Sequence, residues 1–247
     1  MPDAAPLLPA HLAPVFWTPD RLGTISAWWG HVPFAHWLVA ASRPGLVVEL
    51  GTHTGVSYAA FCRAVAEGGL ATHCVAVDTW RGDAQAGTYD EAVFEELQAW
   101  NSAQRGGFSR LLRAEFDAAR RLFAPGSIDL LHIDGQHDYA SVRHDFETWL
   151  PAMSRSGVVL FHDTAVRADG FEVWRLWQEL RHTYPSFSFA HGYGLGVLAV
   201  GGAVPAAVRA LCNSTGTPGE AALQAMFRVA GDRWMADQAM RHRGPAV

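Results

Sequence analysis

Hydrophobic positions in the middle of the chain fall into two alternating patterns. Short continuous apolar runs predict strands that are buried on both faces of a parallel sheet. Segments with apolar residues at helical spacing follow these runs and predict amphipathic helices. The predicted strands cover residues 46–51, 73–78, 109–114, 128–134 and 158–163. The predicted helices cover residues 57–69, 88–103, 116–126, 138–153 and 169–184.

Two further apolar runs follow the last of these helices. Residues 186–192 and 194–201 flank a glycine-rich turn and predict an antiparallel hairpin. Five strand–helix units followed by a hairpin predict an α/β fold. We expect a Rossmann-like, doubly wound, mostly parallel seven-stranded sheet with an antiparallel edge hairpin. This core would occupy residues 46–201 of one globular domain.

Both ends of the chain are expected to add helices to this core. Residues 1–45 are rich in Pro, Trp and His and predict a helical lid or extension, with one or two short helices in 18–41. Thr18 or Asp20 is the expected N-cap there. Residues 202–247 are rich in Ala and predict a C-terminal helical extension with a helix near 218–240. These extensions are expected to shape a pocket or an interface in a homo-oligomer.

Composition narrows the class of protein. Of the 247 residues, 49% are hydrophobic and 17% charged, enough for a full core. The net charge of −5 without a long basic run argues against a nucleic-acid partner. All 19 basic residues are Arg, which excludes a lysine base, a Schiff-base lysine and a P-loop lysine. Three isolated cysteines, no apolar run of membrane-spanning length and no signal-like N-terminus predict a soluble, cytoplasmic protein without a membrane partner.

The first predicted strand leads into a glycine turn that is typical of a nucleotide-binding edge. Gly51 and Gly55 are spaced G-x-x-x-G, which differs from the G-x-G-x-x-G of a pyrophosphate-binding dinucleotide loop. The second predicted strand ends in Asp78, which is placed to accept hydrogen bonds from ribose hydroxyls. Asp78 as a helix cap or loop acid is the alternative. Glu115 follows the third strand, where side chains would flank an adenine, or it is a solvated acid.

The fourth and fifth predicted strands both end in carboxylates. Because neighbouring parallel strands place their carboxyl ends side by side, Asp134 and Asp163 should lie within reach of one ion, with His162 as a third ligand. Carboxylate oxygens suit Mg²⁺ or Mn²⁺, and a histidine ligand favours Mn²⁺ or a later metal. The alternative for Asp163 is a helix cap.

His137 lies three residues beyond Asp134 and is the expected general base. A neutral imidazole takes a proton from a hydroxyl near neutral pH, and a metal on that hydroxyl would lower its pKa. A hydrogen-bonded structural histidine is the alternative. His132 is expected to alternate away from the cluster, and Asp138 and Asp145 to cap and solvate the helix that follows.

Four ordered motifs resemble a family of bacterial class I S-adenosylmethionine-dependent methyltransferases. Its members often accompany glycosyltransferases and are related to sugar and macrolide O-methyltransferases. The motifs lie within roughly residues 45–200 and are Val48-Glu49-Leu50-Gly51-Thr52 with Gly55-Val56-Ser57, Asp78-Thr79-Trp80-Arg81-Gly82-Asp83, His132-Ile133-Asp134-Gly135-Gln136-His137-Asp138-Tyr139, and Gly157-Val158-Val159-Leu160-Phe161-His162-Asp163-Thr164.

The resemblance implies a function and a set of site residues. It implies O-methylation of a hydroxyl on a small molecule or glycan, with a sugar hydroxyl favoured, and a divalent metal bound by Asp134 and Asp163. Glu49 would face the methionine amine of S-adenosylmethionine and Asp78 the ribose, and His137 would be the base. Related macrolide-sugar enzymes carry an acid where this chain has His162. The full set of expected cofactor contacts is Glu49, Gly51, Thr52, Gly55, Ser57, Asp78, Thr79, Trp80, Glu115 and Asp134. Trp80 would stack on the ligand or pack against the following helix.

Three other functions are compatible with parts of the sequence. An NAD-dependent oxidoreductase would use the same sheet, but the glycine spacing and the two downstream carboxylates argue against it. A metal-dependent glycosyltransferase would need an Asp-x-Asp motif after an early strand, and none is present. A non-catalytic cofactor-binding protein is the third alternative.

Overall fold

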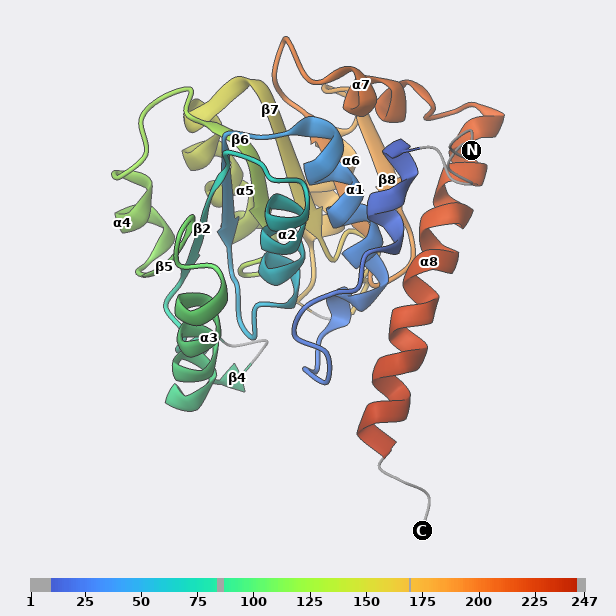
Figure 1. Cartoon of the computed structure of the whole chain (residues 1–247). Helices are drawn as coiled ribbons and strands as arrows, with labels where there is room; N and C mark the ends of the chain where they lie inside the picture. Colours follow the sequence, from blue (N-terminus) through green and yellow to red (C-terminus); the bar gives the residue numbers. More distant parts are fainter. Residues whose placement is uncertain (1–9, 84–86, 169, 244–247) are drawn as a thin grey trace.

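The computed structural model describes residues 10–83, 87–168 and 170–243, so the start of the N-terminal extension and the end of the C-terminal extension lie outside these ranges. Its centre is a seven-stranded sheet in the order β5-β2-β1-β6-β7-β9-β8 (Figure 1). The strands are β1 (Leu46–Leu50), β2 (His73–Asp78), β5 (Ser109–Arg113), β6 (Ile128–Ile133), β7 (Met153–His162), β8 (Ser186–Phe189) and β9 (Leu195–Ala199). Two short strands, β3 (Gly82–Asp83) and β4 (Gly87–Thr88), pair separately.

The sheet is parallel from β5 to β7, and β9 alone runs against its neighbours β7 and β8. This confirms the predicted Rossmann-like sheet with an antiparallel hairpin. The later strand, β9, inserts beside β7, so β8 becomes the outer edge. All of the parallel strands therefore present their carboxyl ends at one edge of the sheet.

Helices cover both faces of the sheet. They are α1 (Val32–Ser42), α2 (Val56–Glu67), α3 (Glu91–Gln104), α4 (Phe116–Arg120), α5 (Tyr139–Trp149), α6 (Val173–Leu180), α7 (Ala206–Asn213) and α8 (Pro218–Arg243). Single-turn or two-turn 3₁₀ segments are η1 (Ala10–Phe16), η2 (Ala27–His31) and η3 (Leu150–Ala152).

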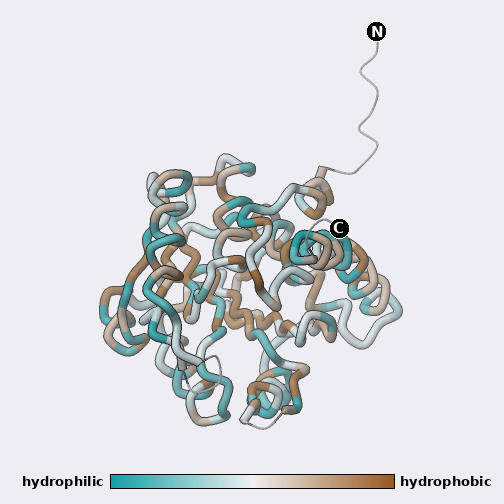
Figure 2. The backbone as a smooth tube through the Cα atoms, turned by 90° about the horizontal axis from the view of Figure 1, so that it is seen from below, coloured by the Kyte–Doolittle hydropathy of each residue, from teal (hydrophilic) through white to brown (hydrophobic). Residues whose placement is uncertain are grey.

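Each face of the sheet has its own hydrophobic core. Val47 belongs to the core that the sheet forms with α1, α2 and α7, and Val48 to the core with α5 and α6. Successive strand residues point to opposite faces, so a sheet covered twice needs apolar residues at every position. That requirement explains the continuous apolar runs. Figure 2, coloured by the hydropathy of each residue, shows hydrophobic residues along the chain in the interior of the molecule.

The N-cap found in the N-terminal segment is a different residue from the predicted ones. Ser26 caps η2 by accepting a hydrogen bond from the backbone N–H of Trp28, at 3.1 Å. The expected caps were Thr18 and Asp20, and this prediction was wrong. Asp20 instead pairs with Arg63 of α2 through Oδ1 and with Arg105, directly after α3, through Oδ2, so its carboxylate is engaged elsewhere.

The two extensions meet each other beside the sheet. Gly231 of α8 lies against the backbone of Gly30 in η2, where a Cβ added to Gly231 would be 2.0 Å from the Gly30 carbonyl oxygen. The same carbonyl accepts a hydrogen bond from His191, at 3.2 Å. Within the described part of the chain, no helix is both long enough and apolar enough to cross a membrane.

This contact generates a stability prediction. Replacing a helical glycine by alanine ordinarily stabilises a helix by about 1 kcal/mol. Gly231→Ala should instead lower the free energy of unfolding by about 1–3 kcal/mol, because its methyl group meets the Gly30 backbone. The matched control is Gly219→Ala in the first turn of α8, where the nearest atom is 3.4 Å away. Urea unfolding measures both, and equal stabilisation of the two variants would contradict the close contact.

Candidate active site

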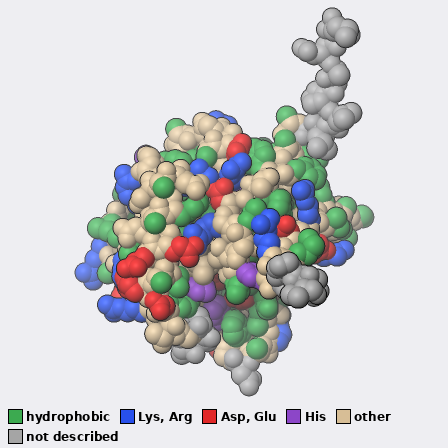
Figure 3. All heavy atoms as spheres, turned by 60° about the horizontal axis from the view of Figure 1, so that its bottom comes forward, with side chains coloured by type: hydrophobic (Ala, Val, Ile, Leu, Met, Phe, Trp, Pro, Cys, Tyr) green, Lys and Arg blue, Asp and Glu red, His purple; other side chains and the backbone are tan. Residues whose placement is uncertain are grey.

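The carboxyl edge of the sheet opens into a cavity of about 910 Å³. Its lining comes from the ends of β1, β2, β5 and β6 and from the facing sides of α4 and α5. Among the residues named from the sequence, Gly51, Asp78, Thr79, Glu115 and Asp134 line it. The end of the molecule to which these strands point is shown in Figure 3, where histidine side chains gather with acidic side chains to one side.

The glycine turn after β1 is held against the end of β6. Gly51 has φ +82°, and a Cβ there would lie 2.0 Å from the carbonyl oxygen of Asp134. Only glycine fits such a close backbone approach. The backbone N–H of Asp134 donates to the carbonyl of Leu50, at 2.9 Å. The floor of the cavity is therefore continuous from the glycine turn to the first predicted metal ligand.

Asp78 fastens this turn to the end of β2. Its carboxylate accepts hydrogen bonds from the backbone N–H groups of Thr52 (2.8 Å), His53 (2.9 Å) and Trp80 (2.7 Å). A carboxylate offers about four acceptor positions, so one is left for a ligand in the cavity that Asp78 lines. The loop-acid role that the sequence left open is thus realised, and room for a ribose hydroxyl remains.

Trp80 lies in the core and not on the cavity surface. Its side chain is 1% exposed, packs on Phe94 of α3 with ring centroids 4.8 Å apart, and donates to the carbonyl of His53, at 3.0 Å. The packing alternative therefore describes Trp80. His53 itself lines the cavity and was not singled out from the sequence.

Glu49 is fully buried behind the glycine turn. One oxygen, Oε2, accepts from Nδ1 of His132 at 2.9 Å, and Ser57 also bonds this carboxylate. The other oxygen, Oε1, has no partner among the described residues. Burial raises the pKa of Glu49, which the bonds to His132 and Ser57 oppose. Thr52 and Gly55 support the same turn, Thr52 as a buried side chain and Gly55 as the residue before α2.

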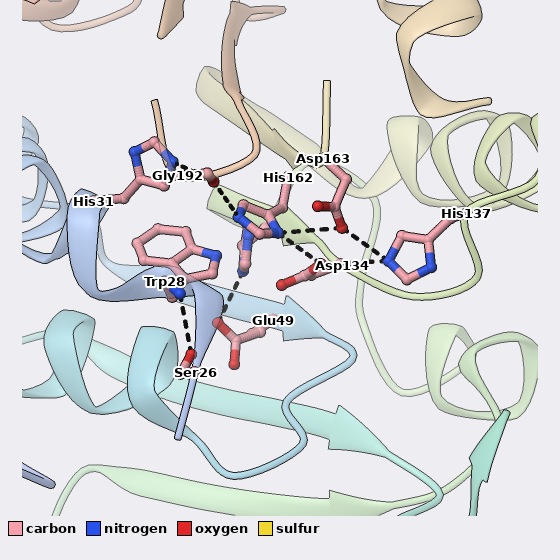
Figure 4. Close-up of polar contacts among 10 residues, drawn as sticks. Ser26, Trp28, His31, Glu49, Asp134, His137, His162, Asp163 and Gly192 are labelled. Atoms are coloured by element: carbon pink, nitrogen blue, oxygen red, sulfur yellow. Dashed lines mark hydrogen bonds and ion pairs between the residues drawn. The ribbon is translucent and has the colours of Figure 1, made fainter. Parts of the chain in front are cut away.

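Asp134, His162 and Asp163 come together as predicted. One ligand atom from each lies within 4.8 Å of the others, a spacing that suits a single metal ion (Figure 4). The Nδ1 atom of His162 is 3.3 Å from Asp134 Oδ1 and 3.3 Å from Asp163 Oδ2. Adjacent parallel strands β6 and β7 cause this meeting, since both carboxylates follow the strand ends directly.

The contact of His162 Nε2 indicates the protonation of the ring. Nε2 lies 3.0 Å from the carbonyl oxygen of Gly192, which can only accept, so Nε2 carries the proton. Nδ1 then faces two carboxylate oxygens and needs a positive charge between them. Burial alone would lower the pKa of His162, but the charges and hydrogen bonds of Asp134 and Asp163 outweigh it and raise the pKa to about 10. A divalent cation on Nδ1 meets the same requirement, with the Gly192 bond orienting the ring.

His137 joins the cluster from the loop after β6. Its Nε2 is 2.9 Å from Asp163 Oδ2 and 4.0 Å from Asp134 Oδ1, and its ring stacks on Phe171 with centroids 4.4 Å apart. Burial opposes ionisation of Asp163, yet hydrogen bonds from His137 and His162 hold its pKa well below the ordinary value. Asp163 has φ +60°, a left-handed conformation that aspartate tolerates.

The N-terminal segment supplies residues that the sequence did not reveal. The carbonyl of Gly192 accepts a second hydrogen bond from His31 Nε2, at 3.0 Å (Figure 4). Trp28 packs edge-on against His132, with centroids 4.9 Å apart, and lies 5.9 Å from His162. His132 bonds Glu49 and lies away from the carboxylate cluster, as expected. No local signal marks Gly192, because its role is a backbone oxygen brought in by the β8–β9 turn.

Asp138 and Asp145 on α5 behave differently from each other. Asp138 caps the helix by accepting from the backbone N–H of Ser141, at 3.0 Å, as predicted. Asp145 was expected to be solvated, and this was wrong: its side chain is on the inner face of α5 and lines the cavity, with 7% exposed. Burial raises its pKa to about 7, with His144 opposing and Asp117 and Asp138 adding to the shift.

Residues 48–164 match a protein family described as "Methyltransferase domain". The match begins in β1 and ends one residue after Asp163, so it spans both the glycine turn and the carboxylate cluster. The uncharacterized protein y4gI of Sinorhizobium fredii is 53% identical over 173 residues, which are 70% of this chain and 19% of that protein. The chain thus spans about a fifth of the length of this curated relative.

Solved structures share the fold at low sequence identity. The O-methyltransferase TomG of Streptomyces achromogenes, involved in tomaymycin synthesis and solved with S-adenosylmethionine, aligns with a TM-score of 0.52 at 17% identity, over 72% of this chain and 82% of that one. The Podospora anserina methyltransferase PaMTH1, solved with S-adenosylhomocysteine, aligns with a TM-score of 0.52 at 15% identity, over 77% and 88%. A methyltransferase from Geobacter sulfurreducens aligns with a TM-score of 0.51 at 15% identity, over 71% and 80%.

The buried Asp145 generates a pH prediction. Its pKa of about 7 in the folded protein exceeds the value of 3.8 expected after unfolding, so the unfolded chain binds fewer protons between these values. Stability should therefore fall as pH rises from about 4 to about 7. Asp145→Asn, which stays neutral, should raise the free energy of unfolding by about 2–4 kcal/mol at pH 8 and by little at pH 4. Urea unfolding at the two pH values measures this, and the same gain at both would contradict it.

Proposed function

We propose that this chain is a class I S-adenosylmethionine-dependent methyltransferase that transfers the methyl group of that cofactor to a hydroxyl group, in line with the match of residues 48–164 to a methyltransferase-domain family. The observation that carries the proposal is the continuous cavity floor, in which the glycine turn after β1 adjoins Asp134. A cofactor held by the turn would present its methyl group beside the carboxylate cluster and His137.

The cofactor would lie along the carboxyl ends of β1, β2 and β5. Gly51 lines the cavity at the turn, the remaining acceptor position of Asp78 suits a ribose hydroxyl, and Thr79 and Glu115 line the space beyond. Oε1 of Glu49 has no hydrogen-bond partner among the described residues. It could therefore accept a hydrogen bond from the ammonium group of the methionine moiety. Thr52, Gly55 and Ser57 keep the turn and Glu49 in place from behind.

A divalent metal fits the cluster of Asp134, His162 and Asp163. Two carboxylates and one imidazole nitrogen are a donor set for Mg²⁺ or Mn²⁺, and Nδ1 of His162 already faces the point where an ion would sit. When bound, such an ion would lower the pKa of a coordinated hydroxyl and orient it. Asp134 then serves both halves of the site, because its backbone supports the glycine turn and its carboxylate faces the ion.

His137 is the proposed general base. Its imidazole would accept the proton of the substrate hydroxyl, and the hydrogen bond to Asp163 would stabilise the imidazolium that forms. When bound, the cofactor would supply the methyl group to the hydroxyl oxygen from its sulfonium sulfur, and neutral S-adenosylhomocysteine would leave with the electron pair of the broken carbon–sulfur bond. Proximity and alignment supply most of the acceleration in such a displacement.

The proposed acceptor is a sugar hydroxyl on a small molecule or glycan. The family resemblance favours it, and a pair of carboxylates beside an imidazole offers acceptors for neighbouring hydroxyl groups. We place the reaction in the cytoplasm, in line with three buried cysteines that are all free. The terminal extensions, which pack on each other through Gly30 and Gly231, are the proposed wall of the acceptor side and a candidate interface in a homo-oligomer.

Cofactor choice tests the proposal directly. Isothermal titration calorimetry should detect S-adenosylhomocysteine binding with a Kd in the micromolar range, about −8 kcal/mol, and no comparable binding of NAD. Asp78→Ala should weaken this binding by tenfold or more, because it frees the glycine turn as well as removing an acceptor. Binding of NAD without binding of S-adenosylhomocysteine would replace the methyltransferase proposal with the oxidoreductase alternative.

Two variants separate the metal role from the base role. Asp163→Asn should abolish Mn²⁺ binding, measured by electron paramagnetic resonance of free Mn²⁺, whereas Asp117→Asn on the cavity rim should leave it unchanged. His137→Gln should keep both Mn²⁺ and S-adenosylhomocysteine binding and lose about 10²–10⁴-fold in methyl transfer to an acceptor sugar. Full turnover by His137→Gln would remove His137 as the base, and unchanged Mn²⁺ affinity in Asp163→Asn would remove the metal site.

A further inference from the structure

The cavity continues beyond the strand ends into the space between α4 and α5. This extension is lined by Phe116, Asp117, Arg121, Ser141, His144 and Asp145. It adjoins Gly135, which directly follows Asp134, while His137 and Asp163 are not among the residues that line the cavity. The roles proposed for His137 and Asp163 therefore do not explain its walls.

Asp145 is the buried acid of this extension. Its side chain is 7% exposed, and no hydrogen bond or ion pair to it is found within residues 10–83, 87–168 and 170–243. The nearest cationic candidate, His144, is engaged at the rim with Asp117, at 2.9 Å. A buried carboxyl group without a partner is costly, and such groups mark places where a ligand completes the hydrogen bonding.

The surroundings of Asp145 indicate the shape of that ligand. An added Cβ on Gly135 would lie 2.6 Å from the ring of Phe116 and 3.5 Å from Asp145 Oδ2. The aromatic ring, the bare α-carbon of Gly135 and the carboxyl group thus meet at one point of the cavity wall. Phe116 directly follows Glu115, the residue expected beside the adenine. A flat heterocycle with polar atoms on its edge is the kind of ligand that fits a wall of this composition.

We propose that Asp145 recognises the six-position edge of the adenine ring of the bound cofactor, an inference that rests on the proposed function. That edge carries an amino donor beside the ring acceptor N1. A protonated carboxyl group matches both, because its carbonyl oxygen accepts from the amino group while its O–H donates to N1. The pKa of Asp145, raised to about 7 by burial, keeps this proton available near neutrality. His144, Asp117 and Asp138 are the charged groups that influence it.

Calorimetry at pH 6.5 with three ligands tests the assignment. The ligands are S-adenosylhomocysteine, its 6-deamino analogue and its 7-deaza analogue, which keeps the amino group and N1. The wild type should bind the 6-deamino analogue about tenfold more weakly than S-adenosylhomocysteine, and the 7-deaza analogue about equally. Asp145→Leu should bind all three with similar, weakened affinity. Asp145→Asn should retain the discrimination, because an amide presents the same donor and acceptor to adenine.

The controls distinguish failure of the adenine assignment from failure of the proposed methyltransferase function. Glu147→Gln, on the exposed side of α5 and outside the cavity lining, should discriminate between the ligands like the wild type. Failure of the wild type to bind S-adenosylhomocysteine at all would overturn the proposed function. Binding of S-adenosylhomocysteine with undiminished affinity for the 6-deamino analogue would overturn only the role of Asp145. That comparison needs no variant, so it stands even if Asp145→Leu does not fold.

Discussion

The arrangement of the rest of the site depends on two carboxylates at the ends of neighbouring strands. Because β6 and β7 are parallel and adjacent, Asp134 and Asp163 emerge side by side, and a positive charge must lie between them. His162 is placed to meet this need with either a proton or a metal ion on Nδ1. The carbonyl of Gly192 orients the ring for this through its hydrogen bond with Nε2. The position of that carbonyl depends in turn on the β8–β9 turn and on His31.

The same dependence explains why segments outside the sheet belong to the site. η2 brings His31 to Gly192 and Trp28 to the rings of His132 and His162, and α8 supports η2 through the contact of Gly231 with Gly30. On the opposite side, the glycine turn touches the backbone of Asp134, and Asp78 fastens that turn. The edge proposed to hold the cofactor and the carboxylate cluster are therefore coupled through a short stretch of backbone. In the proposed reaction, this coupling would fix the distance between the methyl donor and the acceptor hydroxyl.

The sequence was sufficient to predict the position of candidate site residues that directly follow a strand. Apolar runs located β1, β2, β6 and β7, and the residues directly after them, Asp78, Asp134 and Asp163, had to share one edge of a parallel sheet. The sequence was insufficient where tertiary packing decides. Trp80 is equally compatible with stacking or burial until α3 is placed, and Gly192 acts through a carbonyl that any residue would carry. Asp145 was expected to be solvated, but it lies on the inner face of α5, and only the packing of that helix shows this. The cap at Ser26 was missed because Asp20, a strong capping type, is recruited by two arginines.

The most direct test of the central claim is a crystal structure of the protein grown with S-adenosylhomocysteine and Mn²⁺, with anomalous scattering used to locate the metal. The account predicts one manganese peak bound by Asp134, His162 Nδ1 and Asp163. It also predicts that the sulfur of the cofactor lies beside that ion and that the adenine lies against Phe116 and Asp145. A cofactor bound elsewhere, or an anomalous peak away from these three side chains while the cluster keeps its internal hydrogen bonds, would contradict it.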